Sequence, residues 1–201
     1  MPDEPFRGLD SLATPMAATQ AWLEKAVIGL NLCPFAKAVH LKQQIRYVVS
    51  EAVGEEALLA DLLRELHFLA GTDPERVATT LLIHPGVLGD FLDFNDFLEL
   101  ADAAVEELGL AGEIQVASFH PDYQFAGTEA GDIENFSNRS PFPTLHLLRE
   151  SSIEQAVAAL PDAAEIYERN IATLRALGLA GWQRLWAKPD QGPTTRGKSK
   201  P

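Results

Sequence analysis

The pattern of hydrophobic and polar residues predicts three strands separated by helices. Residues 45–49 alternate in polarity, which is typical of a strand with at least one buried face. Residues 79–83 form a short continuous β-prone run, as expected for a central strand covered on both faces. Residues 114–119 predict a third strand. The second and third strands each end in a His-Pro pair, at His84 and at His120.

Two start signals predict helices before the first strand. Thr14 followed by proline resembles an N-cap with proline at the first helical position, and apolar spacing then extends the helix over about 15–29. Cys33 followed by proline repeats the signal and predicts a short helix over about 33–41.

Two longer helices are predicted to connect the three strands. A leucine-rich stripe over residues 58–71 predicts the first, and residues 93–109, with Asp93 as the cap, predict the second. Right-handed crossovers of this kind make strands parallel. His84 and His120 are therefore expected at the same carboxyl edge of the sheet.

The segment from 120 to 142 has no helical or strand period, and such long irregular stretches are usually functional or disordered. Its aromatic residues favour order. Residues 143–149 predict a fourth strand, antiparallel to the third because no crossover helix intervenes. Two capping boxes predict helices over about 151–160 and 162–177. The predicted fold class is α/β, with a mixed sheet of about four strands, three of them joined by helical crossovers, covered by helices.

The length of 201 residues favours one α/β domain over 15–186, between a flexible N-terminus at 1–14 and a disordered basic tail at 187–201. The formal net charge of −13 argues against nucleic-acid binding. No apolar run is long enough for a membrane span, and the N-terminus does not resemble a signal peptide. A single cysteine excludes an internal disulfide. These features predict a cytoplasmic protein that binds no membrane.

Four strings of the sequence resemble a bacterial family known as domain of unknown function 1415: IGLNLCPFA (28–36), DFNDF (93–97), VASFHPDYQFAGT (116–128) and NRSPFPTLHLLR (138–149). The resemblance covers roughly Pro15 to Leu179. It implies a protein of about this length with no established activity, cofactor or partner. It therefore supplies no catalytic residues that could be carried over.

Three residues are candidates for catalysis. If the short helix begins at Cys33, its sulfur lies at a helix N-terminus, where a thiolate is stabilised for nucleophilic or ligand use. The alternative is that Cys33 fills the core. His84 and His120 would serve as acid and base at the sheet edge, where ligands bind in open α/β sheets. Alternatively, each histidine forms hydrogen bonds that shape its own turn.

The loop supplies candidate substrate-binding residues. Arg139 is the only cation between His120 and His146, and a guanidinium is well suited to binding a carboxylate or phosphate. Asp122, Tyr123 and Asn138 add a carboxylate, a phenol and an amide. The alternative is a structural ion pair of Arg139 with Asp132 or Glu134. His146 is interpreted as a satisfied interior histidine, whereas His40 and His67 fall on helices in surface or packing roles.

Three functions remain open from sequence. The first is a small-molecule enzyme with a Cys/His site that binds an anionic substrate. The second is a metal site in which His84 and His120, with Cys33 or with Asp122, supply three ligands of a zinc-like centre, although no tight metal-ligand spacing is present. The third is a ligand- or partner-binding module without catalysis. No nucleotide fingerprint is present, the cofactor is unknown, and the sequence leaves the reaction and the oligomeric state open.

Overall fold

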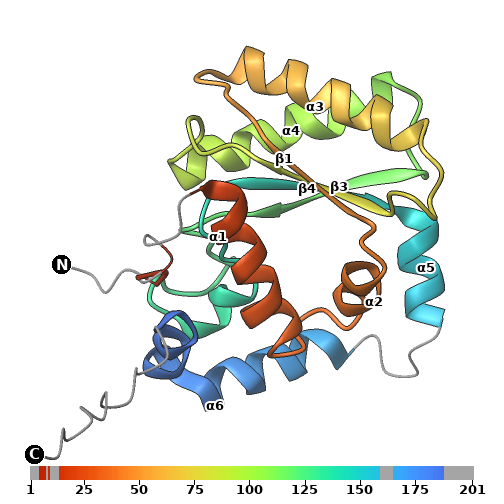
Figure 1. Ribbon diagram of the computed structural model, residues 1–201. Coiled ribbons are helices and arrows are strands. Elements are labelled where there is room, and N and C mark those ends of the chain that lie inside the picture. Colours follow the sequence, from red (N-terminus) through yellow and green to blue (C-terminus); the bar gives the residue numbers. More distant parts are fainter. Residues whose placement is uncertain (1–4, 8, 10–13, 159–164, 188–201) are drawn as a thin grey trace, which may run out of the picture.

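Four strands form one mixed sheet in the order β1-β2-β4-β3. A computed structural model of the chain describes residues 5–7, 9, 14–158 and 165–187 (Figure 1). Strand β1 pairs in parallel with β2, whereas β4 is antiparallel to both of its neighbours, β2 and β3. The predicted fold class is confirmed. The strands are β1 (Ile45–Val49), β2 (Thr79–Ile83), β3 (Ile114–Phe119) and β4 (Thr144–Arg149).

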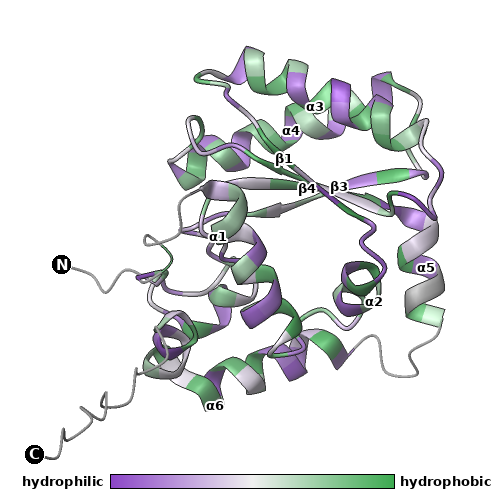
Figure 2. Ribbon diagram, in the orientation of Figure 1, coloured by the Kyte–Doolittle hydropathy of each residue, from purple (hydrophilic) through white to green (hydrophobic). Residues whose placement is uncertain are grey.

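Helices cover both faces of this sheet. Figure 1 shows α3 and α4 above the sheet and α1, α2 and α6 below it. The helices carry hydrophobic as well as hydrophilic residues along their length (Figure 2), as expected of elements with one buried face. Their bounds are α1 (Pro15–Trp22), α2 (Ala36–Leu41), α3 (Glu55–Ala70), α4 (Phe91–Glu107), α5 (Glu150–Ala158) and α6 (Ile166–Trp186), with a π-helix η2 (Leu23–Ile28) and a 3-10 helix η3 (Ile133–Ser137).

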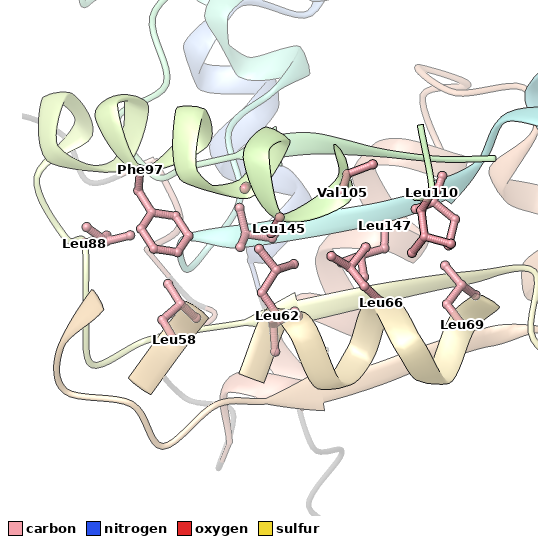
Figure 3. Close-up of a cluster of buried hydrophobic side chains, with 14 of the residues drawn as sticks. Leu58, Leu62, Leu66, Leu69, Leu88, Phe97, Val105, Leu110, Leu145 and Leu147 are labelled. Carbon is pink, nitrogen blue, oxygen red and sulfur yellow. The ribbon is translucent and has the colours of Figure 1, made fainter. Parts of the chain in front are cut away.

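The upper core lies between the sheet and the α3–α4 pair. The predicted leucine stripe forms one face of α3, and its side chains meet those of α4 and β4 in Figure 3. Leu145 and Leu147 of β4 point into this core, while His146 between them points to the other face and contacts the ring of Phe119. Successive side chains of a strand point to opposite faces of the sheet, so neighbouring residues of β4 belong to different layers of the fold.

The lower core joins α1 and η2 to α6 and to the long loop. Trp182 and Trp186 of α6 pack with Trp22 of α1 and with Phe136 of the long loop. The centroids of the rings of Phe136 and Trp182 are 5.1 Å apart at an interplanar angle of 83°. This edge-to-face geometry is favourable for aromatic pairs.

Helix α4 begins one turn earlier than predicted. Its N-cap is Asp90, whose carboxylate accepts hydrogen bonds from the amides of Leu92 (2.8 Å) and Asp93 (3.3 Å). The prediction of Asp93 as the cap was wrong. Asp93 lies within the first turn, where its negative charge still interacts favourably with the helix dipole.

One other predicted helix boundary differs, and one agrees. Helix α2 begins at Ala36 and not at Cys33, because residues 33–36 form a turn in which the Ala36 amide donates to the Cys33 carbonyl at 3.3 Å. The helix predicted to end at 177 does stop there, because Gly178 adopts a non-helical conformation with a φ of 62° and a ψ of 171°. A second helical stretch then follows this kink and extends α6 to Trp186. The start that was predicted for this helix at 162 lies outside the described residues.

Candidate functional site

The carboxyl ends of β2 and β3 place two histidines at one edge of the sheet, as the crossovers predicted. Both strands run antiparallel to β4, which lies between them. The side chains of His84 and His120 are fully buried (0% exposed). Both rings pack on Phe94 of α4, with centroid distances of 5.7 and 5.1 Å.

Both nitrogens of His120 have protein partners. The backbone amide of Asp122 donates to Nδ1 at 3.0 Å, and Nε2 lies 3.1 Å from the carbonyl oxygen of Leu88. Because a carbonyl only accepts, Nε2 must carry the proton and the ring is neutral. Burial lowers the pKa of His120, although the Leu88 carbonyl opposes this effect. This imidazole therefore links the loop after β3 to the loop after β2.

His84 is only partly satisfied. Its Nδ1 donates to the carbonyl oxygen of Val87 at 3.1 Å, whereas Nε2 is buried and has no partner within the described part of the chain. Burial lowers the pKa of His84 to about 4. The ring is therefore neutral at physiological pH.

Arg139 lies inside the long loop. Its Nε donates to the carbonyl of Tyr123 at 3.1 Å, and its Nη2 donates to the carbonyl of Ala130 at 2.6 Å. The guanidinium also lies over the ring of Phe136, 4.5 Å from the centroid. Only 7% of Arg139 is exposed, and within the described residues no carboxylate lies within ion-pair distance of it.

The two acids proposed as structural partners of Arg139 have other partners. Glu134 pairs with Arg175 at 2.8 Å, and that guanidinium lowers the pKa of the carboxyl group. Asp132 accepts a hydrogen bond from the amide of Glu129 at 2.8 Å. The predicted alternative pairing of Arg139 is therefore not formed.

Backbone hydrogen bonds bring the two ends of the loop together. The amide of His120 donates to the carbonyl of Asn138 at 3.2 Å, and the amide of Ser140 donates to the carbonyl of His120 at 3.4 Å. Asn138 and Arg139 consequently lie beside Tyr123, while the Asp122 side chain is exposed. Burial raises the pKa of Tyr123, so its hydroxyl remains a hydrogen-bond donor.

Sequence reasoning missed Asn135, which holds the loop from within. Its fully buried side chain accepts hydrogen bonds from the Phe125 amide (3.0 Å) and the Thr128 hydroxyl (2.8 Å), and it donates to the Glu129 carbonyl (2.8 Å). An asparagine in an irregular stretch has no periodic pattern that would reveal its burial. Three side-chain hydrogen bonds explain why the segment is ordered without a regular period.

Cys33 lies in a different environment from the two histidines. It is partly buried and packs against the lower apolar cluster, whereas the two imidazoles contact α4 above the sheet. Because α2 begins three residues later, the thiol is not at the helix start that the sequence predicted. No hydrogen bond of the described residues joins Cys33 to His84 or His120.

His146 has the interior role that was predicted for it. Its Nε2 lies 2.8 Å from the hydroxyl of Thr79, which in turn donates to the carbonyl of Leu147 at 2.6 Å. The Thr79 oxygen must therefore accept from Nε2. Burial lowers the pKa of His146 to about 4, so this ring is also neutral.

Comparison with known proteins places this domain in a family. A family model described as "Protein of unknown function (DUF1415)" matches residues 14–184. The chain belongs to this family. No curated protein and no solved structure matches this DUF1415 chain. The matched region includes the whole sheet, both helical layers and the long loop, so the loop and its histidines are part of the DUF1415 domain itself.

The described residues include no group of three or more His, Cys, Asp and Glu side chains that could hold a metal ion. None of the helices in this part of the DUF1415 chain combines the length and apolar character needed to cross a bilayer.

Proposed function

We propose that this protein binds a small anionic molecule at the loop of residues 122–142, with Arg139 as its charged contact. The observation that carries the proposal is the buried guanidinium without a carboxylate partner among the described residues. Taking an ionised group out of water is costly unless an opposite charge compensates it. The two carbonyls that it contacts satisfy hydrogen-bond donors but supply no negative charge. The carboxylate of Asp122 lies beyond ion-pair distance, and its charge does not offset the burial that lowers the pKa of Arg139.

The neighbouring residues suit the same ligand. Tyr123 keeps its phenolic proton because burial raises its pKa more than a hydrogen bond with the Asn138 side chain lowers it, and the Asn138 amide keeps a second N–H as a further donor. Donors of this kind complement the oxygens of a carboxylate or phosphate. The exposed Asp122 would contact a hydroxyl or amino group elsewhere on the ligand, since it would repel the anionic group itself.

The geometry supports binding better than catalysis by Cys33, His84 and His120. A general acid or base must reach the reacting group within hydrogen-bond distance. Both imidazoles have no exposed surface, so neither reaches a ligand unless the loops move, whereas 7% of Arg139 is exposed. Their role in this proposal is to fix the ends of β2 and β3, on which the loop is built.

Thermal unfolding of the full chain in the presence of phosphate, succinate or neutral glycerol tests the proposal. A ligand that binds only the folded state at about 100 times its dissociation constant stabilises that state by about 2.7 kcal/mol. We expect saturable stabilisation by one of the anions and none by glycerol. Arg139→Gln should abolish it, whereas Arg64→Gln, which removes an exposed arginine from α3, should retain it.

A second variant covers the case in which Arg139→Gln does not fold. Tyr123→Phe combined with Asn138→Ala removes the donors and leaves the guanidinium in place, and it should weaken binding of the same anion. The proposal is wrong if neither anion stabilises the wild-type chain, or if the stabilisation is equal in the wild type and in the folded loop variants.

A further inference from the structure

A second polar site lies below the sheet, beside the edge strand β1. A cleft of about 500 Å³ opens between α1, η2, α2 and β1, the elements drawn in red to orange in Figure 1. Volumes of this size are typical of small-molecule sites. Five of its lining residues are polar: Gln20, Glu24, His40, Gln43 and Tyr47.

Three ionisable side chains converge on this cleft from three different elements. The carboxylate of Glu24, on η2, lies 3.7 Å from Nε2 of His40, on α2. Both side chains are open to solvent, with 57% and 33% of their surface exposed. The hydroxyl of Tyr47, on β1, is buried and has no hydrogen-bond partner within the described ranges. Burial, together with the nearby charge of Glu24, raises the pKa of Tyr47 to about 12, so the hydroxyl stays protonated.

The backbone that presents Glu24 is unusual. Residues 23–28 form a π-helix, a conformation that is rare and occurs frequently at functional sites. The π-helix is followed by Gly29, where a Cβ atom would lie 2.2 Å from the carbonyl oxygen of Lys25. Only glycine fits that position without a backbone shift. The local sequence therefore maintains a wide helical turn at the wall of the cleft.

We propose that this cleft binds a small molecule that carries a protonated amine. Glu24 supplies the only carboxylate among the lining residues, and the lining includes no lysine or arginine. Leu41 and Ile45 add an apolar wall suited to a short carbon chain. The net charge of −13 also favours the approach of a cation. The site differs from the proposed anion site in its layer of the fold and in the sign of the charge it recognises.

An NMR titration of the full-length chain at neutral pH tests this inference. The probes are n-butylammonium, butan-1-ol and butyrate, which share a carbon chain and differ in charge. We expect saturable shifts of the backbone amides of Gln20, Gln43 and Tyr47 with the amine, at a dissociation constant on the order of 1 mM, as befits so small a ligand. The alcohol should bind roughly tenfold more weakly or worse, because it lacks a charge-assisted hydrogen bond.

Matched variants separate a specific site from general attraction to an acidic protein. Glu24→Gln should reduce the affinity for the amine to that for the alcohol. Glu168→Gln, which removes a carboxylate from a separate surface cavity of about 480 Å³ on α6, should leave the affinity unchanged. Arg139→Gln should also leave it unchanged, which separates this result from the fate of the anion proposal.

Three outcomes would overturn the inference. They are saturation by butyrate or butan-1-ol at the same concentration as the amine, amine binding that survives Glu24→Gln, and shifts that stay linear or lie outside the cleft.

Discussion

His84→Asn is expected to flatten the dependence of stability on pH. The shorter amide places a donor near the position of Nδ1, so the hydrogen bond to the Val87 carbonyl is retained while the titratable ring is removed. In the wild type, burial lowers the pKa of His84 from 6.5 to about 4. The unfolded chain therefore binds a proton at a pH where the folded chain does not.

The sign and size of the effect follow from proton linkage. Because the pKa is lower in the folded state, the free energy of unfolding decreases as the pH falls from about 6.5 to about 4. Below about pH 4, His84 is protonated in both states and causes no further decrease. Each tenfold difference in proton affinity corresponds to about 1.4 kcal/mol, so His84 alone should account for about 3 kcal/mol of lost stability. Above pH 6.5 the contribution of His84 to this pH dependence disappears.

Urea unfolding between pH 4 and pH 7, followed by tryptophan fluorescence, measures this contribution. The three tryptophans, Trp22, Trp182 and Trp186, are all buried and will report loss of the lower core. Other groups titrate in the same range, so the informative quantity is the free energy of unfolding of the wild type minus that of the variant at each pH. If this difference is the same at every pH, the substitution changed packing alone. If the difference decreases towards low pH, it reports the titration of His84.

His67→Asn serves as the matched control, because it removes an imidazole from an exposed position on α3. If the wild type and His84→Asn lose stability in parallel on acidification, His84 is not the buried neutral group that its environment indicates.

Three further variants test the packing and the loop. Gly29→Ala should destabilise the chain by about 1–3 kcal/mol in urea, since the new methyl group would overlap the Lys25 carbonyl; a loss no larger than that of Gly54→Ala, where the space is open, would contradict the close approach. Leu62→Ala in the fully buried stripe should lower stability by about 2–5 kcal/mol in thermal unfolding, and a neutral result would mean that the upper core is not packed as described. Asn135→Ala should cost about 1–3 kcal/mol and speed amide exchange of the Phe125 amide; exchange as slow as in the wild type would show that the loop is ordered by other contacts.

The position of the two histidines could be predicted from sequence because it depends on local periods and chain chirality. The strands that precede His84 and His120 are separated by one helical crossover, and crossovers of this kind have one hand. That β4 would insert between β2 and β3 was not predictable. Its pairing with β2 joins residues more than sixty positions apart, and no short-range pattern encodes such a register.

The candidate site was predictable only in part for the same reason. The loop residues Tyr123, Asn138 and Arg139 are close in sequence to strand ends, and the structure brings them together. Cys33 was assigned to the edge through a helix start that does not form at that residue. The cleft at Glu24, His40 and Tyr47 was missed, because its lining comes from separate elements and no motif connects them.

The sequence by itself determined the order of the four strands and the main helices along the chain, the leucine stripe of α3 and the shared edge of the two histidines, because hydrophobic period, turn chemistry and crossover handedness act over short stretches of chain. Only the tertiary structure decided which polar groups are buried. Desolvation depends on what packs around a side chain from distant elements. Burial keeps His84 neutral, and among the residues that the structure describes it encloses Arg139 without a carboxylate in ion-pair distance and the Tyr47 hydroxyl without a hydrogen-bond partner.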